Sequence, residues 1–555
     1  MTNTMGIFAG AVVGLGLLTA QAAPPASAET TPTGITYYVD SAGGDDARDG
    51  RSEGSAWASL AKVNATTFAS GDAILFRSGA SWTGQLHPKG SGEEGRPITI
   101  GKYGQGAAPK LEGHGNVESV VYLFNQQHWD IGYLEVTNRG TASATAPRRG
   151  VHILGQDYQV GASTNLSKVS TLKGIRIHDL DIHDVNGEDK KDGDGSAGIQ
   201  VSVKVPGMNA QGIPPTNTVR QRTSYDSVTI ENNVIDKVSR SGIITWTDWQ
   251  NRAELGDGLG YGESSITPFT PMTNVVIRGN RLTQIGGDGI VPHQTVDALV
   301  ERNTIAGFNV TSQGYNVGMW TWNGDRTLYQ FNEVSGGKTT MDGNAFDFDH
   351  GSRGVIYQYN YSHDNEGGTL LLCADGRATG GGIYDGVFRY NVSQNDRHQL
   401  FSVCGGANLY NMKVYNNTFY IAPGLSTKVF QAGGGANQVA FNNNIFYNLG
   451  SGGYAAKPSW TYDHNVYFGN NTPSTSVIPD ANGSTADPLL ENPGNATGIG
   501  DLNGYRLTTG SPALRSGVVV TGPGAKDLWG HPANPARPNR GAHAGPGTHP
   551  SPRKG

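Results

Sequence analysis

A short pattern of β-forming and polar residues recurs along the chain. It consists of two or three β-formers, a polar residue, an asparagine and another β-former, as in "VTIENNVI", "VVIRGNRL" and "VIYQYNYS". We align its asparagines at Asn233, Asn280, Asn303, Asn332, Asn360, Asn391, Asn417 and Asn443. We expect them to take the left-handed backbone of a corner and to hydrogen-bond through their amides to the copy in the next turn. A repeat of 20 to 30 residues built from short β-runs, without a helical period, is typical of a β-solenoid. A β-sandwich with asparagine in its turns is the alternative, but it should show hairpins with tight Asn-Gly turns.

A second β-run lies upstream of each asparagine pattern and aligns in seven copies. They cover residues 197–204, 241–248, 288–295, 317–324, 344–351, 368–375 and 399–406. The third position is always apolar and the fifth mostly so, which predicts that both face the interior of the coil. Positions four and six should then face solvent. Pro292, at position five, lacks the N–H that a central strand needs, so we expect a local bulge there.

The outward positions carry the candidate chemistry. In "NAFDFDHG" (344–351), Asp347 and Asp349 occupy positions four and six. Neighbouring rungs lie about 4.8 Å apart, so these acids should share one face with aromatic residues of earlier rungs, namely Trp246, His293, Trp320 and Trp322. Solvent-facing tryptophans on adjacent rungs are unfavourable unless something covers them, and an indole face stacks well on a sugar ring.

Two long irregular insertions follow this strand in early rungs, at 205–227 and 249–273. Loops longer than about 15 residues are usually functional or disordered. Both should leave the same edge of the same sheet, so we expect them to wall a groove that runs across the rungs.

Composition and the chain ends set the broad class. The net charge of -6 offers no basic footprint, so we expect no nucleic-acid partner. An apolar run leads to Ala26-Ser27-Ala28, a pattern typical of a signal peptide over residues 1–28 and of a secreted protein without a membrane anchor. We expect a parallel β-helix domain over 29–545, with an N-terminal cap at about 36–116, and a disordered tail at 546–555.

The two cysteines test the alignment. Cys373 and Cys404 both occupy position six on consecutive rungs, which predicts Cα atoms about 4.8 Å apart, within the range of disulfides. An exported chain allows oxidation. We predict a disulfide; two free thiols packed as small apolar residues are the alternative.

Segments at both ends of the coil carry a family resemblance. The N-terminal "YYVDSAGGDDARDGRSEGSAWASL" and the C-terminal "SPALRSG" with "DLWGHPANPARPNRGAHAG" resemble the entry and exit segments of secreted right-handed parallel β-helix proteins of the pectate-lyase-like superfamily. That superfamily contains polysaccharide lyases and glycoside hydrolases. The resemblance implies an all-β, right-handed, single-stranded parallel β-helix that acts on carbohydrate, and no catalytic residue is carried over from it.

The acid pair suggests a reaction. Residues i and i+2 of a strand are about 6.5 to 7 Å apart, and glycosidases use two carboxyl groups at about 5 to 9.5 Å. We therefore predict a glycoside hydrolase with Asp347 and Asp349 as general acid and base, without assigning which is which, and with His293 as a further catalytic candidate. Predicted substrate-binding residues are Trp246, Trp320, Trp322, His350, Asp375 and Arg377.

Two other functions stay open. A polysaccharide lyase acting on uronate-containing glycans would need a base and often Ca²⁺, which Asp347, Asp349 and Asp375 could hold. No Lys or Arg falls at position four or six of the aligned strand, which counts against a lyase. A non-catalytic glycan-binding or surface-structural β-helix would keep the tryptophans without needing the acids. For the hydrolase we expect no cofactor or metal, a polysaccharide or oligosaccharide substrate, and a monomer.

Overall fold

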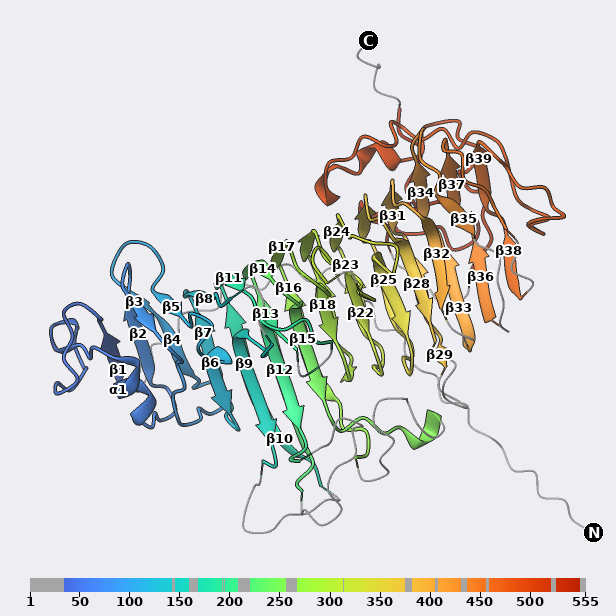
Figure 1. The fold of residues 1–555 in the computed structure, drawn as a ribbon. Helices are drawn as coiled ribbons and strands as arrows, with labels where there is room; N and C mark the ends of the chain where they lie inside the picture. The colour runs from blue at the N-terminus through green and yellow to red at the C-terminus, as the bar shows by residue number, and fades with distance from the viewer. Residues whose placement is uncertain are drawn as a thin grey trace, which may run out of the picture.

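The fold is a right-handed, single-stranded parallel β-helix, as predicted, and Figure 1 shows it as one elongated coil. In a computed structural model, the described residues are 34–141, 145–158, 168–191, 193, 195–207, 220–255, 267–312, 314–374, 382–404, 408–430, 437–455, 459–520 and 526–549. The predicted signal peptide, Asp375 and Arg377 lie outside these residues.

Successive turns of the coil contribute strands to three parallel sheets of 16, 13 and 10 strands. The 16-stranded sheet contains β1 (Thr36–Val39), β2 (Ala73–Arg77), β4 (Ile98–Tyr103), β7 (Trp129–Gly132), β10 (Ser170–His178), β13 (Thr223–Glu231), β16 (Met272–Arg278), β19 (Thr295–Val296), β20 (Leu299–Glu301), β23 (Leu328–Gln330), β26 (Ile356–Gln358), β29 (Ile383–Tyr384), β30 (Val387–Arg389), β33 (Leu409–Tyr415), β36 (Asn437–Asn442) and β38 (Trp460–Asp463). The 13-stranded sheet contains β3 (Ser81–Thr83), β5 (Lys110–Glu112), β8 (Glu135–Asn138), β11 (Asp181–Val185), β14 (Val234–Val238), β17 (Arg281–Thr283), β21 (Thr304–Ala306), β24 (Glu333–Ser335), β27 (Tyr361–His363), β31 (Val392–Gln394), β34 (Thr418–Ile421), β37 (Ile445–Asn448) and β39 (Val466–Gly469).

The 10-stranded sheet carries the candidate site. Its strands are β6 (Ser119–Phe124), β9 (Arg149–Gln156), β12 (Ala197–Lys204), β15 (Ser241–Thr247), β18 (Ile290–Pro292), β22 (Met319–Thr321), β25 (Asn344–Asp349), β28 (Gly368–Cys373), β32 (Gln399–Cys404) and β35 (Lys428–Phe430). The described helices are α1 (Leu60–Ala65) and four short 3₁₀ turns: η1 (Glu53–Ser55), η3 (Ala253–Leu255), η4 (Ile499–Asp501) and η5 (Asn503–Tyr505). Within the described ranges, none of these is long and apolar enough to cross a membrane.

The predicted strand alignment of the 10-stranded sheet is correct. Ile290 pairs with Met319, and Met319 pairs with Phe346 on the next rung. All three side chains are fully buried, since the inward positions of successive rungs stack into one continuous core. The irregularity expected at Pro292 is also present: the ladder between β18 and β22 is limited to the Ile290–Met319 pair, and the N–H of His293 turns back to the carbonyl of Val291 at 2.9 Å.

The asparagines form a buried hydrogen-bond ladder at the corner between two sheets. Nδ2 of Asn233 donates to Oδ1 of Asn280 (2.9 Å) on the next rung and to the carbonyl of Ile177 (3.1 Å). The backbone N–H of Asn233 also donates to that Oδ1 (3.0 Å), so each amide oxygen accepts two bonds. The same arrangement continues through Asn303, Asn332, Asn360, Asn391, Asn417, Asn444 and Asn465.

Two details of the predicted repeat are wrong. The ladder position in "FNNNIF" is Asn444, because Asn417 bonds to Asn444 rather than to Asn443. The left-handed conformation is taken by the residue before each ladder asparagine, for example Tyr359 (φ 59°) and Asn443 (φ 54°), and not by the ladder asparagine itself. The ladder asparagine is selected for its amide alone, because only a side chain with both a donor and an acceptor can continue the chain of bonds.

The C-terminal segment folds back over the 13-stranded sheet (Figure 1, red). The side chain of Glu333 accepts the N–H of Ile499 at 2.8 Å, and Tyr505 is buried in the apolar cluster beneath. Residues up to 549 belong to this fold, since the carbonyl of Thr548 accepts the N–H of Thr509 at 2.7 Å. The tail predicted from residue 546 therefore contains residues that backbone hydrogen bonds hold in place.

Candidate active site

Strand β25 places the two candidate acids on the outside of the coil. Phe346 and Phe348 point into the core, with at most 1% of their surface exposed. Since side chains alternate along a strand, Asp347 and Asp349 point outward. Asp347 pairs with Trp320 on one side and Leu371 on the other, and Asp349 pairs with Cys373, as the alignment predicted.

The outward face of this sheet does not lie open to solvent, which corrects the prediction for positions four and six. Trp246, Trp320 and Trp322 are only 7%, 5% and 3% exposed. The segment before β12 crosses them: a Cβ at Gly193 would lie 2.3 Å from the Trp246 ring, and the Lys191 ammonium lies 4.8 Å above the centre of Trp320. The three indoles therefore build a second apolar layer rather than free platforms for sugar rings.

His293 is a buried part of that layer. Its ring lies edge-on to Trp320, with 4.4 Å between the ring centres, and its Nδ1 accepts the backbone N–H of Trp322 at 3.0 Å. Burial lowers the pKa of His293 to about 3, so the ring is neutral near neutral pH. An N–H donor at Nδ1 leaves the proton of the neutral ring on Nε2. His293 thus orders the backbone at Trp322 and is not poised as a general base.

The surroundings of Asp347 raise the pKa of its carboxyl group. It is 3% exposed, and among the described residues its Oδ1 has no hydrogen-bond partner. Burial raises the pKa of Asp347 well above its usual value, and the negative charges of Asp349 and Asp342 raise it further, while Lys191 opposes them. Asp347 therefore holds a proton under conditions in which an ordinary aspartate is ionised.

Asp349 lies in a different environment. It is half-buried, and its Oδ1 accepts the backbone N–H of His350 at 2.6 Å. A hydrogen bond of this kind stabilises the ionised carboxylate. His350 itself is 3% exposed and lies below the surface. The two acids that the sequence could not tell apart thus differ in burial and in hydrogen bonding.

The structure adds three charged residues that the sequence did not indicate. Asp342 is half-buried, and burial, reinforced by Asp288 and opposed by Lys191, raises its pKa to about 6. Asp288 is buried and accepts the Trp320 indole N–H at 2.9 Å. The sequence pattern did not indicate Asp288, Asp342 or Lys191. The two aspartates precede the outward positions four and six of the aligned strands, and Lys191 lies in a segment that does not follow the repeat.

The insertions are only partly described. Residues 208–219 and 256–266 lie outside the described ranges, so the groove that they were expected to wall stays a prediction. The described part of the second insertion is anchored: Arg252 is fully buried and forms two hydrogen bonds with Asp325, at 2.8 and 2.9 Å. The predicted binding residues Asp375 and Arg377 lie outside the described ranges as well.

Cys373 and Cys404 lie side by side on consecutive rungs. Their Cα atoms are 4.8 Å apart, and the structure joins them as a disulfide. Both side chains lie on the outward face of the sheet and pack against the apolar layer of the tryptophans.

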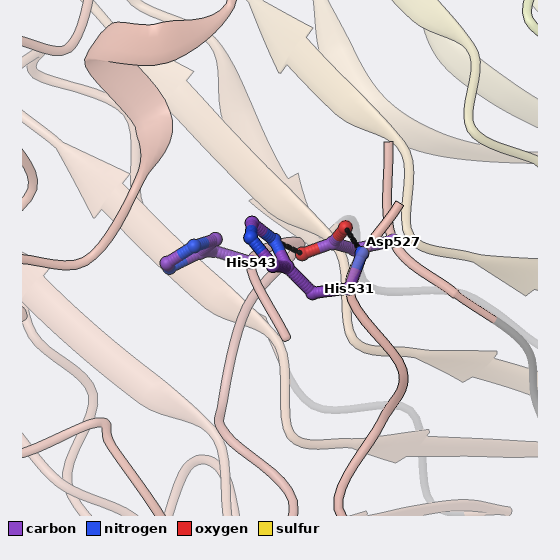
Figure 2. Close-up of side chains that lie close together, drawn as sticks. All are labelled: Asp527, His531 and His543. Atoms are coloured by element: carbon purple, nitrogen blue, oxygen red, sulfur yellow. Dashed lines mark hydrogen bonds and ion pairs between the residues drawn. The ribbon is translucent and has the colours of Figure 1, made fainter. Parts of the chain in front are cut away.

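A separate cluster deserves a test as a metal site. Asp527, His531 and His543 bring possible ligand atoms within 4.8 Å of one another, and Figure 2 shows their side chains together. However, Nδ1 of His543 accepts the N–H of Leu507 at 3.1 Å, so the neutral ring carries its proton on Nε2, the atom that would have to bind the ion. Both carboxylate oxygens of Asp527 already accept backbone N–H groups. The cluster therefore holds the C-terminal segment together by hydrogen bonds and is poorly suited to bind a metal ion.

Comparison with known proteins finds similarity to two proteins named lacto-N-biosidases. The chain is 28% identical over 603 residues to a lacto-N-biosidase from Bifidobacterium longum, covering 92% of this chain and 36% of the relative. It is similar to the crystal structure of GH136 lacto-N-biosidase from Eubacterium ramulus, with a TM-score of 0.55 and 26% identity, covering 71% of this chain and 64% of that one. The chain thus spans about a third of the first relative and just under two thirds of the second. No protein-family model matches the chain.

Proposed function

We propose that this protein is a glycoside hydrolase in which Asp347 is the general acid and Asp349 the ionised carboxylate. The observation that carries the proposal is the contrast between the two neighbouring acids of β25. Burial raises the pKa of Asp347, whereas Asp349 is more exposed and accepts the backbone N–H of His350. Two carboxyl groups in opposite protonation states are what glycoside hydrolysis requires.

In this mechanism each acid has one task. Asp347 gives its proton to the glycosidic oxygen as the bond to the anomeric carbon breaks, so the leaving sugar departs as an alcohol. Asp349, as the general base, takes a proton from the water molecule that attacks the anomeric carbon, so a bond to the water oxygen forms as the glycosidic bond breaks. The apolar layer of Trp320 and Leu371 beside Asp347 keeps water from the proton that is to be transferred.

Asp342 is the second candidate for the acid. Its pKa of about 6 also suits proton donation near neutral pH, and it is more accessible than Asp347. Asp347 is preferred because it is the one that lies directly beside Asp349 on the strand.

The substrate follows from the relatives. Both are named lacto-N-biosidases, so we propose an oligosaccharide that carries a lacto-N-biose unit. The apolar run at the N-terminus and the disulfide support export from the cell.

A polysaccharide lyase fits the site less well. Its Ca²⁺ would need ionised carboxylates, whereas burial keeps Asp347 protonated. Its base would have to remove a carbon-bound proton, yet Nδ1 of His293 is occupied by the N–H of Trp322 and burial raises the pKa of Asp347.

The proposal is tested by incubating the protein with an aryl lacto-N-bioside and with a panel of uronate-containing polysaccharides. We expect release of the aryl alcohol and of new reducing ends. Ultraviolet absorbance from unsaturated uronates, without hydrolysis of the aryl glycoside, would instead identify a lyase. Binding of glycans without either product would identify the non-catalytic alternative.

A further inference from the structure

Two apolar side chains stand exposed at the edge of the candidate site. Tyr315 is 62% exposed and Met341 is 46% exposed, among the highest values for large hydrophobic residues in the described chain. They are neighbours, because Asn316 and Asp342 form a parallel bridge between adjacent rungs, which places Tyr315 level with Met341. Exposed neighbouring hydrophobic residues usually mark a surface that something covers.

The backbone at Tyr315 is held firmly. Asn316 is fully buried, its Nδ2 donates to Oδ1 of Asn309 at 2.8 Å, and its carbonyl accepts the N–H of Gly343 at 2.9 Å. The N–H of Val317 donates to Asp288 at 2.9 Å, and the Lys191 ammonium donates to the carbonyl of Tyr315. An exposed aromatic ring on a fixed backbone binds a ligand at little cost in conformational entropy.

This pair adjoins the acids of the site. Met341 directly precedes Asp342, whose charge acts on Asp347. Lys191 connects the two regions: it bonds to Tyr315 and lies over Trp320, the rung partner of Asp347. Tyr315 is therefore at the Asp342 side of the site, away from Asp349, which ends strand β25.

We propose that Tyr315, with Met341 beside it, forms a subsite that stacks on a pyranose ring of the oligosaccharide substrate. The inference rests on the proposed function and deepens it. The apolar C–H face of a pyranose matches an exposed tyrosine ring, and the buried indoles of Trp246, Trp320 and Trp322 cannot serve that purpose. The ring bound here is the sugar of the lacto-N-biose unit that does not carry the cleaved bond.

The test separates binding from chemistry. Titration calorimetry with lacto-N-biose is carried out in an Asp349→Asn background, and kinetics with an aryl lacto-N-bioside in the wild-type background. We expect Tyr315→Ala to raise Kd and KM about tenfold, the scale of one lost aromatic contact, with kcat changed by less than about threefold. Tyr315→Phe should keep wild-type values, since stacking does not need the hydroxyl.

Tyr133 supplies the matched control, because it is 47% exposed on a distant early rung. Tyr133→Ala should leave Kd and KM unchanged, and all variants should keep the wild-type melting temperature. Unchanged Kd and KM in Tyr315→Ala overturn the subsite while leaving the hydrolase intact. Absence of hydrolysis by the wild-type protein, with normal binding of lacto-N-biose, overturns the proposed function instead. Failure of the Asp349→Asn protein to bind lacto-N-biose overturns both.

Discussion

Asp347 lies directly beside Trp320 across the β22–β25 ladder, with its carboxyl on the same outward face as the indole. The indole N–H is already taken by Asp288 at 2.9 Å, so Trp320 offers Asp347 an apolar wall and no hydrogen bond. This neighbour makes the surroundings of the two acids differ: those of Asp347 raise its pKa, whereas Asp349 is more exposed and accepts a backbone N–H.

Replacing either acid should abolish most of the activity. We expect Asp347→Asn and Asp349→Asn each to lower kcat about 10²-fold or more, the scale of lost acid–base catalysis, with unchanged melting temperatures. Asp297→Asn is the control, because Asp297 is an exposed aspartate paired with Arg326. Near-normal turnover in both site variants would show that catalysis lies elsewhere.

The pH profile should report the charges around Asp347. Asp342 raises the pKa of Asp347 and Lys191 lowers it. The alkaline limb of kcat/KM follows loss of the acid's proton, so Asp342→Asn should move that limb to lower pH and Lys191→Met should move it to higher pH. Lys191→Arg, which keeps the charge, should stay close to wild type. A 10²-fold loss of kcat in Asp342→Asn would make Asp342 the acid in place of Asp347.

His363 should make stability depend on pH. Burial lowers its pKa, but hydrogen bonds to Asp364 and Glu333 outweigh burial and raise the pKa to about 9. Since the unfolded value is about 6.5, this contribution is fully present below about pH 6.5 and is lost as pH rises through about 9. It amounts to at most about 3 kcal/mol in the free energy of unfolding.

Denaturant unfolding at pH 6 and pH 9.5 measures that contribution. His363→Gln should lose stability at pH 6 and little at pH 9.5, whereas His114→Gln, at an exposed histidine, should change neither. Equal losses for His363→Gln at both pH values would mean that the charge of His363 contributes nothing.

The cysteine pair should be oxidised when the protein is produced in an oxidising compartment. Titration of unfolded, unreduced protein should find no free thiol, and reduction should release two. The bond closes a loop across a sequence separation of 31 residues, for which chain entropy predicts a loss of about 3 to 4 kcal/mol on reduction. Two thiols before reduction would show that the residues are adjacent without being joined.

The asparagine ladder should be costly to interrupt. Asn332→Ala removes a fully buried amide that bonds to Asn303 and Asn360, leaving buried groups on both rungs unpaired. We expect a loss of about 2 to 4 kcal/mol in the free energy of unfolding. Asn482→Ala, which removes an exposed amide bonded to Asp463, should cost well below 1 kcal/mol.

The strand repeats could be predicted from the sequence, whereas the segments that cover the outward face of the 10-stranded sheet could not. Alternation along β25 predicted the inward Phe346 and the outward Asp347, and the Cys373–Cys404 pairing followed from the same alignment. Asn443 was chosen over Asn444 because three consecutive asparagines leave the period ambiguous by one residue. Gly193, which lies against Trp246, belongs to a segment without period, so no pattern indicated that the tryptophans would be buried.

The asparagine ladder also has a direction and an end. Every ladder amide donates one N–H to the side chain on its C-terminal side, and the last one, Asn465, donates from both nitrogens to Oδ2 of Asp480, at 3.0 and 2.9 Å. A carboxylate accepts hydrogen bonds and has none to give. Asp480 therefore ends the ladder, because a side chain without a donor cannot pass the chain of hydrogen bonds on to a further asparagine. The same corner that repeats one amide from rung to rung thus closes on an acid, and a single side chain sets the last step of the repeat.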